Sequence, residues 1–436
     1  MANPDTTQTT NAVLTDLPPV QIEGKPGDRA GTQAGASANQ SAATGSVEVS
    51  FVMPCLNEAE TLKGCIDACW KCIRENNLSA EIVIGDNGST DGSQQIATSN
   101  GARVAHAPAK GYGNALMAGF AAARGKYIIM GDSDQSYDFS EGMRFITKLR
   151  EGYDLVMGTR FGEGKIDPGA MPFKHRWLGN PVLSFIGRLL FKCPVRDFHC
   201  GLRAFSKASY ETWDLRTTGM EFASELAIKA TLKNSRITEV PITLHKDGRS
   251  RPPHLRSWRD GWRHLRFMMM LSPRWTLFFP GVALVMLGLV LGALTLFGTT
   301  VIAGVSLDVH TLLAASLFLI VGYMWITTAA AMRIYSLTSE IGPPGPRVEK
   351  MFKHFTLERG LIAGVATTIG GVATIGWLVW VWAQKDFGAL DLHTTIRPMI
   401  TGATLIAIGV QTVLMSVIYS MMGIRHKAGA GAGATK

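Results

Sequence analysis

Four long stretches without a charged residue constrain this chain more than any other feature. These uncharged stretches are residues 275–307, 309–332, 360–384 and 398–424. Each holds about 20 apolar residues, or about 30 Å of helix, which matches the hydrocarbon core of a bilayer. A buried helix of a soluble protein rarely stays uncharged for so long. The sequence therefore predicts four transmembrane helices, at 276–297, 312–332, 360–382 and 398–422.

The basic residues predict how these helices are oriented. Seven arginines lie between positions 249 and 274, just before the first span, and five basic residues lie in the loop 333–359 after the second. The loop around Asp308 has neither lysine nor arginine. Lysine and arginine concentrate on the cytoplasmic side of membrane proteins. We therefore expect an integral protein of a bacterial-type inner membrane, with its soluble part and both termini in the cytoplasm.

The rest of the chain divides by composition. Residues 1–46 are rich in Thr, Ala, Gln, Gly, Ser and Pro and contain no apolar core of a signal peptide, so we expect a disordered tail. We then expect a soluble domain at 47–245, a juxtamembrane region at 246–274, a membrane domain at 275–424 and a flexible tail at 425–436. The net charge of +9 favours electrostatic attraction to anionic lipids at a membrane surface. No nucleic-acid-binding motif is present, so we expect no nucleic-acid partner.

The soluble domain alternates short β-branched runs with helical patterns. The predicted strands are 47–53, 81–85, 103–106, 126–130 and 154–158, and the predicted helices are 61–76, 93–99, 114–123 and 140–150. This alternation is typical of a mostly parallel sheet covered by helices on both faces. Ligands bind such sheets at the carboxyl ends of the strands.

Polar segments follow four of the predicted strands, at 54–58, 86–91, 110–113 and 132–135. In the last of them, Asp132 and Asp134 are one residue apart after an apolar run. Two such carboxylates can share one divalent cation, which in turn can hold the diphosphate of a nucleotide. Asp, Ser and Gly are also common in ordinary turns, so the aspartate pair taken by itself is also compatible with a simple turn.

The glycine-containing loop Lys110-Gly111-Tyr112-Gly113-Asn114 follows the third predicted strand and opens a helix. Glycine there lets the backbone approach a phosphate at the helix N-terminus, although a tight turn would need glycine equally. A dinucleotide-binding fingerprint would instead follow the first strand. We therefore exclude a nucleotide-dependent oxidoreductase.

Cys65, Cys69 and Cys72 are spaced by four and three residues. This spacing places them on one face of a helix, whereas structural zinc sites usually pair close cysteines in loops. We expect buried, reduced thiols in a cytoplasmic domain rather than a metal site.

Together these segments resemble the catalytic domain of glycosyltransferase family 2, of the GT-A type. The resemblance rests on FVMPCLNE at 51–58, IGDNGSTDGS at 84–93, KGYGNAL at 110–116, GDSDQSYDF at 131–139, MGTRF at 157–161 and DFHCGLRAF at 197–205. With the trailing helices, the chain is similar to polyprenyl-phosphate and dolichyl-phosphate glycosyltransferases. The resemblance implies an α/β GT-A (Rossmann-like) domain, then an interfacial amphipathic helix and four transmembrane helices.

The resemblance also implies an enzyme: an inverting, metal-dependent transferase that moves one sugar from a UDP- or GDP-hexose to polyprenyl phosphate at the cytoplasmic membrane face. Mg²⁺ or Mn²⁺ would be held by Asp132 and Asp134. Asn87 stands where many relatives have a second aspartate, which leaves UDP or GDP open. The residues expected to bind the donor are Pro54, Asn57, Glu58, Asp86, Asn87, Lys110, Gly111, Asp132, Ser133 and Gln135.

A phosphate acceptor explains why no serine, histidine or cysteine nucleophile is needed, because an ionised phosphate can attack the anomeric carbon itself. Guanidinium groups match phosphate oxygens. The residues expected to bind the acceptor phosphate are Arg160, Arg176, Asn180, Arg249 and Arg251. Asp197 matches a family acid near the reacting centre, and its role in chemistry or in orienting an arginine or the sugar is open. We group Asp132, Asp134, Asp197 and Arg160 as catalytic.

Residues 256–271 predict an amphipathic helix with two stripes. The basic stripe is Arg256, Arg259, Arg263 and Arg266, and the apolar stripe is Trp258, Trp262, Leu265 and Met269. Such a helix is expected in the membrane interface. The alternative is a helix docked on the catalytic domain with a solvated basic face.

Two rival functions remain. Processive polysaccharide synthases share the aspartates but carry a QxxRW motif, and here Phe173 stands where the glutamine would precede Arg176 and Trp177. A non-enzymatic membrane scaffold is the other rival, against which the retained acids, arginines and glycine loop argue. The sequence leaves a homo-oligomer open.

Overall fold

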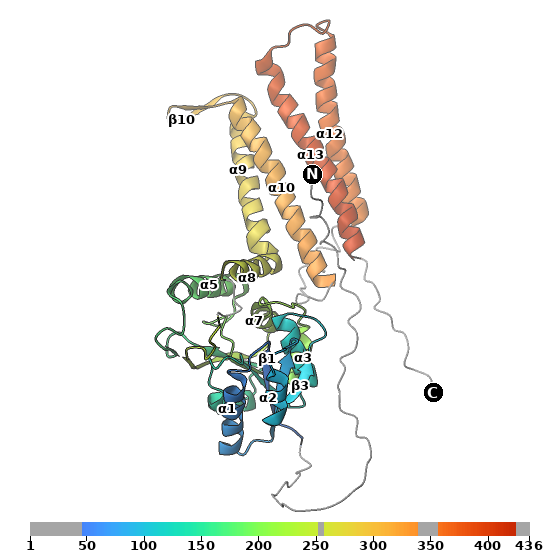
Figure 1. Ribbon diagram of the computed structural model, residues 1–436. Helices are drawn as coiled ribbons and strands as arrows, with labels where there is room; N and C mark the ends of the chain where they lie inside the picture. Colours follow the sequence, from blue (N-terminus) through green and yellow to red (C-terminus); the bar gives the residue numbers. More distant parts are fainter. Residues whose placement is uncertain (1–45, 252–256, 339–355, 424–436) are drawn as a thin grey trace, which may run out of the picture. The chain divides into compact units, whose positions relative to one another are not determined.

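The computed structural model describes residues 46–251, 257–338 and 356–423 (Figure 1). These residues form two compact units. The first comprises the described residues up to Arg188 together with Cys193–His264, and the second comprises Leu189–Lys192 and the described residues from Leu265 onward. Apart from Ser46, the predicted tails at 1–46 and 425–436 lie outside the described residues.

A seven-stranded sheet forms the centre of the first unit, in the order β3-β2-β1-β4-β7-β5-β8. Its strands are β1 (Val49–Cys55), β2 (Ala80–Asp86), β3 (Arg103–His106), β4 (Tyr127–Met130), β5 (Leu155–Thr159), β7 (Arg203–Ser206) and β8 (Ile237–Pro241). The pairs β1–β2, β1–β4, β2–β3 and β5–β8 are parallel, so the prediction of a mostly parallel sheet is confirmed. The short strand β7 was not predicted, and it runs antiparallel between β4 and β5.

Helices cover both faces of this sheet because side chains alternate along β1. A Cβ on Gly142 of α4 would lie 3.1 Å from Phe51, whereas a Cβ on Gly119 of α3 would lie 2.4 Å from the neighbouring Val52. The helices of the unit are α1 (Leu62–Glu75), α2 (Ser93–Ser99), α3 (Tyr112–Ala122), α4 (Gly142–Arg150), α5 (Asn180–Phe191), α6 (Lys207–Trp213) and α7 (Phe222–Leu232), of which α5 continues into the second unit from Leu189. Short elements are η1 (Phe139–Glu141), η2 (His175–Gly179), β6 (Lys165–Ile166) and β9 (Thr243–Leu244).

The cysteines on α1 belong to the hydrophobic core. Cys65, Cys69 and Cys72 are buried and unpaired, as predicted. Burial raises the pKa of the Cys65 thiol to about 12, which keeps it protonated at neutral pH. Within the described ranges, no group of three or more His, Cys, Asp or Glu side chains is placed to hold a metal ion.

The second unit contains four helices that are long and apolar enough to cross a membrane: Arg274–Thr295, Val309–Thr338, Leu357–Ala383 and Thr394–Met422. They match the four predicted spans. The elements are η3 (Arg274–Phe278), α9 (Phe279–Thr295), β10 (Thr300–Ile302), β11 (Val305–Leu307), α10 (Val309–Thr338), α12 (Leu357–Ala383) and α13 (Leu392–Gly423), and α8 (Ser257–Leu271) belongs to both units.

Polar side chains inside this bundle find partners across helices. Ser316 on α10 lies 2.6 Å from Thr404 on α13, and Tyr323 lies 2.7 Å from Thr412. A hydroxyl in hydrocarbon is stable only when its hydrogen bonds are made. These pairs therefore join α10 to α13.

Candidate functional site

Loops from the ends of β1, β2 and β4 meet at one edge of the sheet. Ser133 Oγ donates to the Pro54 carbonyl at 2.7 Å, and Thr61 Oγ1 donates to the Ser133 carbonyl at 2.7 Å. The loop after β2 joins through Thr90, whose N–H donates to Asn57 Oδ1 at 2.8 Å. These bonds bring together three of the four polar segments that the sequence singled out.

The Asp132 carboxyl lies in a desolvated place against a second acid. Its Oδ1 accepts from the Tyr112 hydroxyl at 2.9 Å, and a Cβ on Gly201 would come within 2.6 Å of Oδ2. Burial and, next, the charge of Asp134 raise the pKa of Asp132 to about 6. The two carboxylates therefore share a site that disfavours two uncompensated negative charges.

Asp134 uses both of its oxygens. Oδ1 accepts from the Ser136 N–H at 3.0 Å and from its hydroxyl at 2.5 Å, while Oδ2 accepts from Arg249 Nη2 at 2.5 Å. The next residue, Gln135, has a left-handed backbone with φ of 64°, which is uncommon for a residue other than glycine and occurs in tight functional turns. Its side chain is exposed and donates to the Thr61 carbonyl at 3.3 Å.

The pair Asp132 and Asp134 fits a hard divalent cation. Both supply carboxylate oxygens, the ligands that Mg²⁺ and Mn²⁺ accept. Positive charge near Asp132 would offset the burial and the charge of Asp134 that raise its pKa, and Asp134 already accepts a cationic partner, Arg249. Within the described part of the chain, no third His, Cys, Asp or Glu side chain joins the pair.

Asp86 is buried within its own turn. Its carboxylate accepts from Gly88 N–H at 3.1 Å, from Ser89 N–H and from Gln94 Nε2 at 2.8 Å. These bonds shape the loop after β2, and direct contact of Asp86 with a nucleotide stays a prediction. The neighbouring Asn87 accepts from Gly111 N–H at 3.1 Å, which ties this loop to the glycine loop.

The glycines of that loop are required by a neighbouring backbone. Gly111 has φ of +144°, and a Cβ there would lie 2.3 Å from the Thr218 carbonyl oxygen. Gly113 donates its N–H to the same oxygen at 2.9 Å. The structure thus accounts for both glycines without a phosphate. Lys110, at the start of the loop, is exposed.

Tyr112 was missed by the sequence analysis. It lies between these two glycines, in a motif interpreted only for its backbone, and it is the residue whose hydroxyl reaches Asp132. No local signal in the sequence points to this bond, because twenty residues separate the two partners.

Arg160 and Asp197 form a buried ion pair. Arg160 Nε and Nη2 donate to the two Asp197 oxygens at 2.7 Å each, and the Arg160 N–H donates to Oδ2 at 3.0 Å. The side chains are 7% and 0% exposed. Of the roles left open for Asp197, orienting an arginine is the one for which this geometry provides the contacts.

Arg176 lies in an exposed apolar stretch. Its side chain is exposed, and its guanidinium lies 5.6 Å from the centre of the Trp177 ring. Asn180, the other expected acceptor residue in this stretch, donates from Nδ2 to Met171 Sδ at 3.4 Å. Burial and then the charge of Arg160 lower the pKa of His175, so the start of the stretch lies within electrostatic reach of Arg160.

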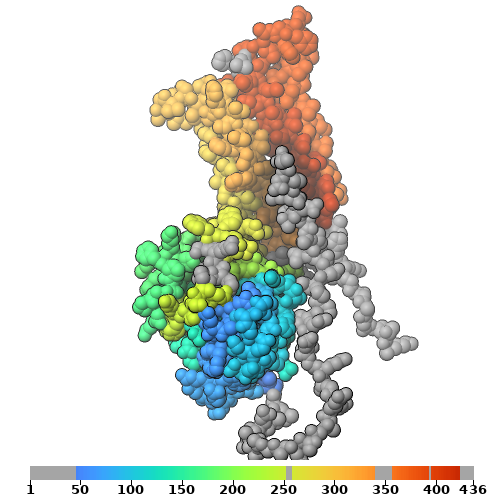
Figure 2. All heavy atoms as spheres, viewed as in Figure 1, coloured from blue at the N-terminus to red at the C-terminus, as the bar shows by residue number. Residues whose placement is uncertain are grey.

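This exposed apolar surface was not predicted. Its side chains are Phe173, Trp177, Leu178, Val182 and Phe185, each between 43% and 77% exposed. In Figure 2 the green residues of this part of the chain form the left edge of the first unit. The spacing of 178, 182 and 185 by four and three, an amphipathic helical pattern, could have revealed it.

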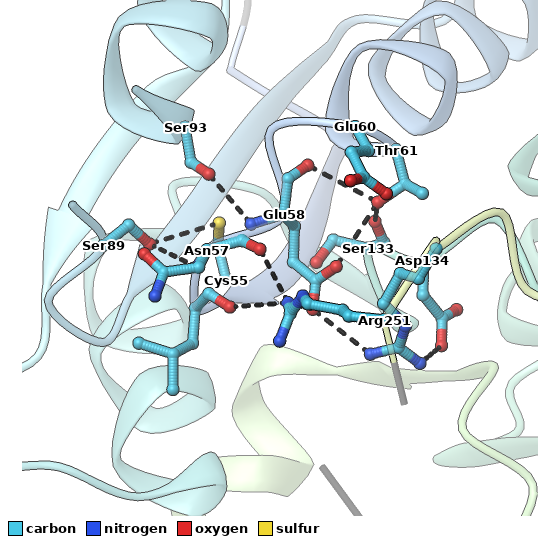
Figure 3. A network of polar contacts seen from close by, with 12 residues as sticks. Cys55, Asn57, Glu58, Glu60, Thr61, Ser89, Ser93, Ser133, Asp134 and Arg251 are labelled. Atoms are coloured by element: carbon cyan, nitrogen blue, oxygen red, sulfur yellow. Dashed lines mark hydrogen bonds and ion pairs between the residues drawn. The ribbon is translucent and has the colours of Figure 1, made fainter. Parts of the chain in front are cut away.

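Arg249 and Arg251 contact the acids beside β1 and β4. Arg249 Nη1 lies 3.2 Å from Glu58 Oε1, in addition to its bond with Asp134. Arg251 Nη2 lies 3.0 Å from the same Glu58 oxygen and donates to the Asn57 carbonyl at 2.6 Å (Figure 3). Both arginines thus lie among the residues expected to bind the donor, and their binding of an acceptor phosphate stays a prediction.

Helix α8 docks on the first unit through a face that neither predicted stripe includes. Asp260 and His264, four residues apart, are buried, and His264 Nδ1 lies 2.8 Å from Ser224 Oγ. Trp258 and Trp262 are 90% and 56% exposed, and the position of this helix in a membrane interface stays a prediction. The predicted stripe residue Arg256 lies outside the described residues.

Comparison with known proteins gives two family matches. Residues 50–213 match "Glycosyl transferase family 2", and residues 330–423 match "Glycosyltransferase family 2 C-terminal transmembrane region". The low-salt glycan biosynthesis hexosyltransferase Agl6 of Haloferax volcanii is 35% identical over 376 residues, which is 86% of this chain and 89% of that protein.

Two further proteins are more distant. A dolichyl-phosphate hexose transferase of Haloferax volcanii is 31% identical over 164 residues, covering 37% of this chain and 69% of that protein. Among solved structures, glucosyl-3-phosphoglycerate synthase from Mycobacterium tuberculosis, in complex with Mn²⁺, UDP and glucosyl-3-phosphoglycerate, is 21% identical with a TM-score of 0.42. The match covers 52% of this chain and 80% of the solved chain.

Proposed function

The chain belongs to glycosyltransferase family 2, and from this we propose that it transfers a single hexose from a UDP- or GDP-hexose to polyprenyl phosphate, with inversion and with Mg²⁺ or Mn²⁺. It is a membrane glycosyltransferase whose GT-A-like domain is followed by four candidate transmembrane helices. The product would be a polyprenyl-phosphate-linked sugar, made at the cytoplasmic face.

The observation that carries the proposal is the cluster of Asp132, Asp134 and Glu58 at the ends of β1 and β4, contacted by Arg249, in a chain with membrane helices. A divalent cation held by Asp132 and Asp134 would neutralise the leaving diphosphate. Tyr112 would fix the Asp132 carboxylate in place, because its hydroxyl donates to Oδ1. The distant relative named for dolichyl-phosphate hexose transfer supports a lipid phosphate as the acceptor.

On the acceptor side, an ionised phosphate oxygen would attack the anomeric carbon while the bond from that carbon to the diphosphate oxygen breaks. No proton has to be removed from such a nucleophile, so positioning and charge neutralisation suffice. Arg160 suits this role because Asp197 holds its Nε and Nη2, which fixes the plane of the guanidinium and leaves Nη1 on the opposite edge.

The exposed apolar stretch supports a membrane-facing acceptor site. Large apolar side chains such as Phe173, Trp177 and Phe185 are costly to expose to water in a cluster. In a chain that spans a membrane, the headgroup region of the bilayer is their natural environment, and the exposed Arg176 beside them would face lipid phosphates.

The test is direct. Purified protein would be incubated with polyprenyl phosphate and a panel of UDP- and GDP-sugars, with and without Mn²⁺, and the lipids identified by mass spectrometry. We expect one lipid product bearing one hexose, only with metal, and none with Asp134→Ala. A product bearing several sugars would favour a processive synthase, and no product with any donor would favour a non-enzymatic membrane protein.

A further inference from the structure

Residues 245–251, here called the arginine strap, are bonded to both acid-bearing loops. The His245 N–H donates to the Ser136 carbonyl at 3.0 Å, and the Gly248 N–H donates to the Asp134 carbonyl at 2.9 Å. At the other loop, the Ser250 hydroxyl donates to Glu60 at 2.6 Å. Gly248 and Ser250, the two residues that flank Arg249, are therefore each bonded to one of the loops, which holds the Arg249 backbone beside both acids while its long side chain can turn.

The Arg249 guanidinium joins the two loops. It lies 2.5 Å from Asp134 Oδ2, 3.2 Å from Glu58 Oε1 and 3.4 Å from Asp247 Oδ2, with a side chain only 11% exposed. Its Nε is buried and has no hydrogen-bond partner among the described residues. The arrangement is thus held by charge, with one donor left unsatisfied.

The same Asp134 oxygen is needed by a divalent cation. Asp134 Oδ1 already accepts two bonds from Ser136, and Oδ2 is the oxygen bonded to Arg249. A cation that binds Asp132 and Asp134 together through Oδ2 would lie beside the Arg249 guanidinium, and the repulsion between the two positive charges makes them compete for this oxygen. A guanidinium carries a single charge and cannot compensate the acids as fully as a divalent ion can.

We propose that Arg249 is an internal substitute for the cation in the donor-free enzyme, and that the diphosphate of the donor draws it away from Asp134. This inference rests on the proposed function, since it requires a cation and a nucleotide diphosphate at this site. Its consequence is cooperative binding. The cation alone must break the Arg249–Asp134 pair, whereas in the presence of nucleotide Arg249 exchanges a carboxylate for phosphate oxygens, which a guanidinium fork matches well.

Such an exchange is a coupling free energy between two ligands, and coupling is reciprocal. The nucleotide must tighten Mn²⁺ binding by the same factor by which Mn²⁺ tightens nucleotide binding. Removing Arg249 should raise the affinity for Mn²⁺ alone and weaken the coupling. A residue that acts only through its general positive charge would not change the coupling in this way.

The experiment uses the full-length protein in detergent, with no acceptor lipid. Free Mn²⁺ is titrated by electron paramagnetic resonance, alone and with saturating UDP or GDP, in wild type and Arg249→Gln. We expect Arg249→Gln to bind Mn²⁺ alone at least about tenfold more tightly than wild type, within the range usual for coupled ligands. We also expect nucleotide to tighten its Mn²⁺ binding by a smaller factor than in wild type.

Arg150→Gln is the matched control, because Arg150 makes two hydrogen bonds to a carboxylate outside the site, that of Glu48. This variant should keep the wild-type coupling, which separates displacement from Asp134 from the general loss of one positive charge. Arg249→Lys serves as a second variant if Arg249→Gln does not fold; it keeps the charge without the fork and should give intermediate Mn²⁺ affinity.

Two negative results have different meanings. If wild type binds Mn²⁺ with nucleotide but Arg249→Gln and Arg249→Lys leave both the affinity for Mn²⁺ alone and the coupling unchanged, the substitute role of Arg249 is refuted and the proposed function stands. If wild type binds no Mn²⁺ with either nucleotide, the metal-dependent function itself is refuted, and the inference with it.

Discussion

The Asp197 carboxylate holds the Arg160 guanidinium in two parallel hydrogen bonds of 2.7 Å, and both side chains are buried. Removing one partner of such a pair leaves a buried charge without compensation, which is far more costly than losing an exposed pair. The position of Arg160 therefore depends on Asp197, whatever Arg160 binds.

Asp197→Asn should impair both stability and acceptor use. The amide keeps the size of the side chain but cannot compensate Arg160, so we expect a loss of about 3–5 kcal/mol in the free energy of unfolding. We also expect a higher KM for polyprenyl phosphate, with the KM for the nucleotide sugar changed little. Denaturant titration and initial rates at varied acceptor measure the two effects.

The chain offers a matched control for this substitution. Arg150 and Glu48 make the same two-bond contact, at 2.8 Å each, but on the surface. Glu48→Gln should change stability by less than about 1 kcal/mol and leave both KM values unchanged. An equal loss in the two variants would argue against a special role for the buried pair.

Tyr112→Phe should weaken cation-dependent transfer without unfolding the domain. It removes the hydroxyl that donates to Asp132 Oδ1, and a hydrogen bond to a charged group contributes about 1.5–3 kcal/mol. We expect at least about a tenfold fall in transfer rate at limiting Mn²⁺, partly recovered at high Mn²⁺. Tyr210→Phe, in the aromatic cluster with Phe205, is the control and should leave the Mn²⁺ dependence intact.

His264 should make the folding stability of the first unit decrease in acid. Burial and then the charge of Arg203 lower its pKa to about 4, from an ordinary value of 6.5. Below pH 6.5 the unfolded chain therefore binds a proton that the folded chain refuses, so stability falls as the pH drops from about 7 toward 4. His264→Gln should lose less stability than wild type between pH 7.5 and 5.

Thermal unfolding at the two pH values tests this. Some acid sensitivity should persist in His264→Gln, because burial also lowers the pKa of the neighbouring His199 well below its ordinary value. An identical loss of stability in wild type and variant would show that His264 does not contribute.

Phe185→Asp should affect the lipid substrate alone. Phe185 is 57% exposed on α5, so a charge there costs little in water but is unfavourable in a membrane interface. We expect the KM for polyprenyl phosphate to rise severalfold and the KM for the nucleotide sugar to stay constant. Lys148→Ala, an exposed change on α4, should alter neither, and a wild-type acceptor KM in Phe185→Asp would contradict a membrane-facing role for α5.

Features that depend on local pattern could be predicted from the sequence. The four spans follow from runs of apolar residues, and the strand ends follow from apolar runs that stop at polar residues, as at Met130 before Asp132. Helix α1 was predicted from cysteines spaced by four and three. Each of these signals lies within a window of about 20 residues.

Features that depend on long-range contact could not be predicted. Arg249 lies 115 residues from Asp134 in the sequence, and no local pattern says which acid a strap arginine will reach. Strand β7 has only four residues, Arg203–Ser206, and its antiparallel position depends on where β4 and β5 lie. The docking face of α8 was missed because Asp260 and His264 are polar, although both are buried.

The position of β7 also determines the order in which the central sheet can form while the chain is being synthesised. Strands β1 to β5 precede β7 in the chain, yet β4 and β5 both need β7 as their neighbour in the sheet. During synthesis the sheet is therefore incomplete at first, and one edge of β4 stays unpaired until residues 203–206 have left the ribosome. An unpaired strand edge invites aggregation, and contacts distant in sequence form slowly. The loop that carries Asp132 and Asp134 follows β4, so catalytic competence should be among the last properties that the newly made protein acquires.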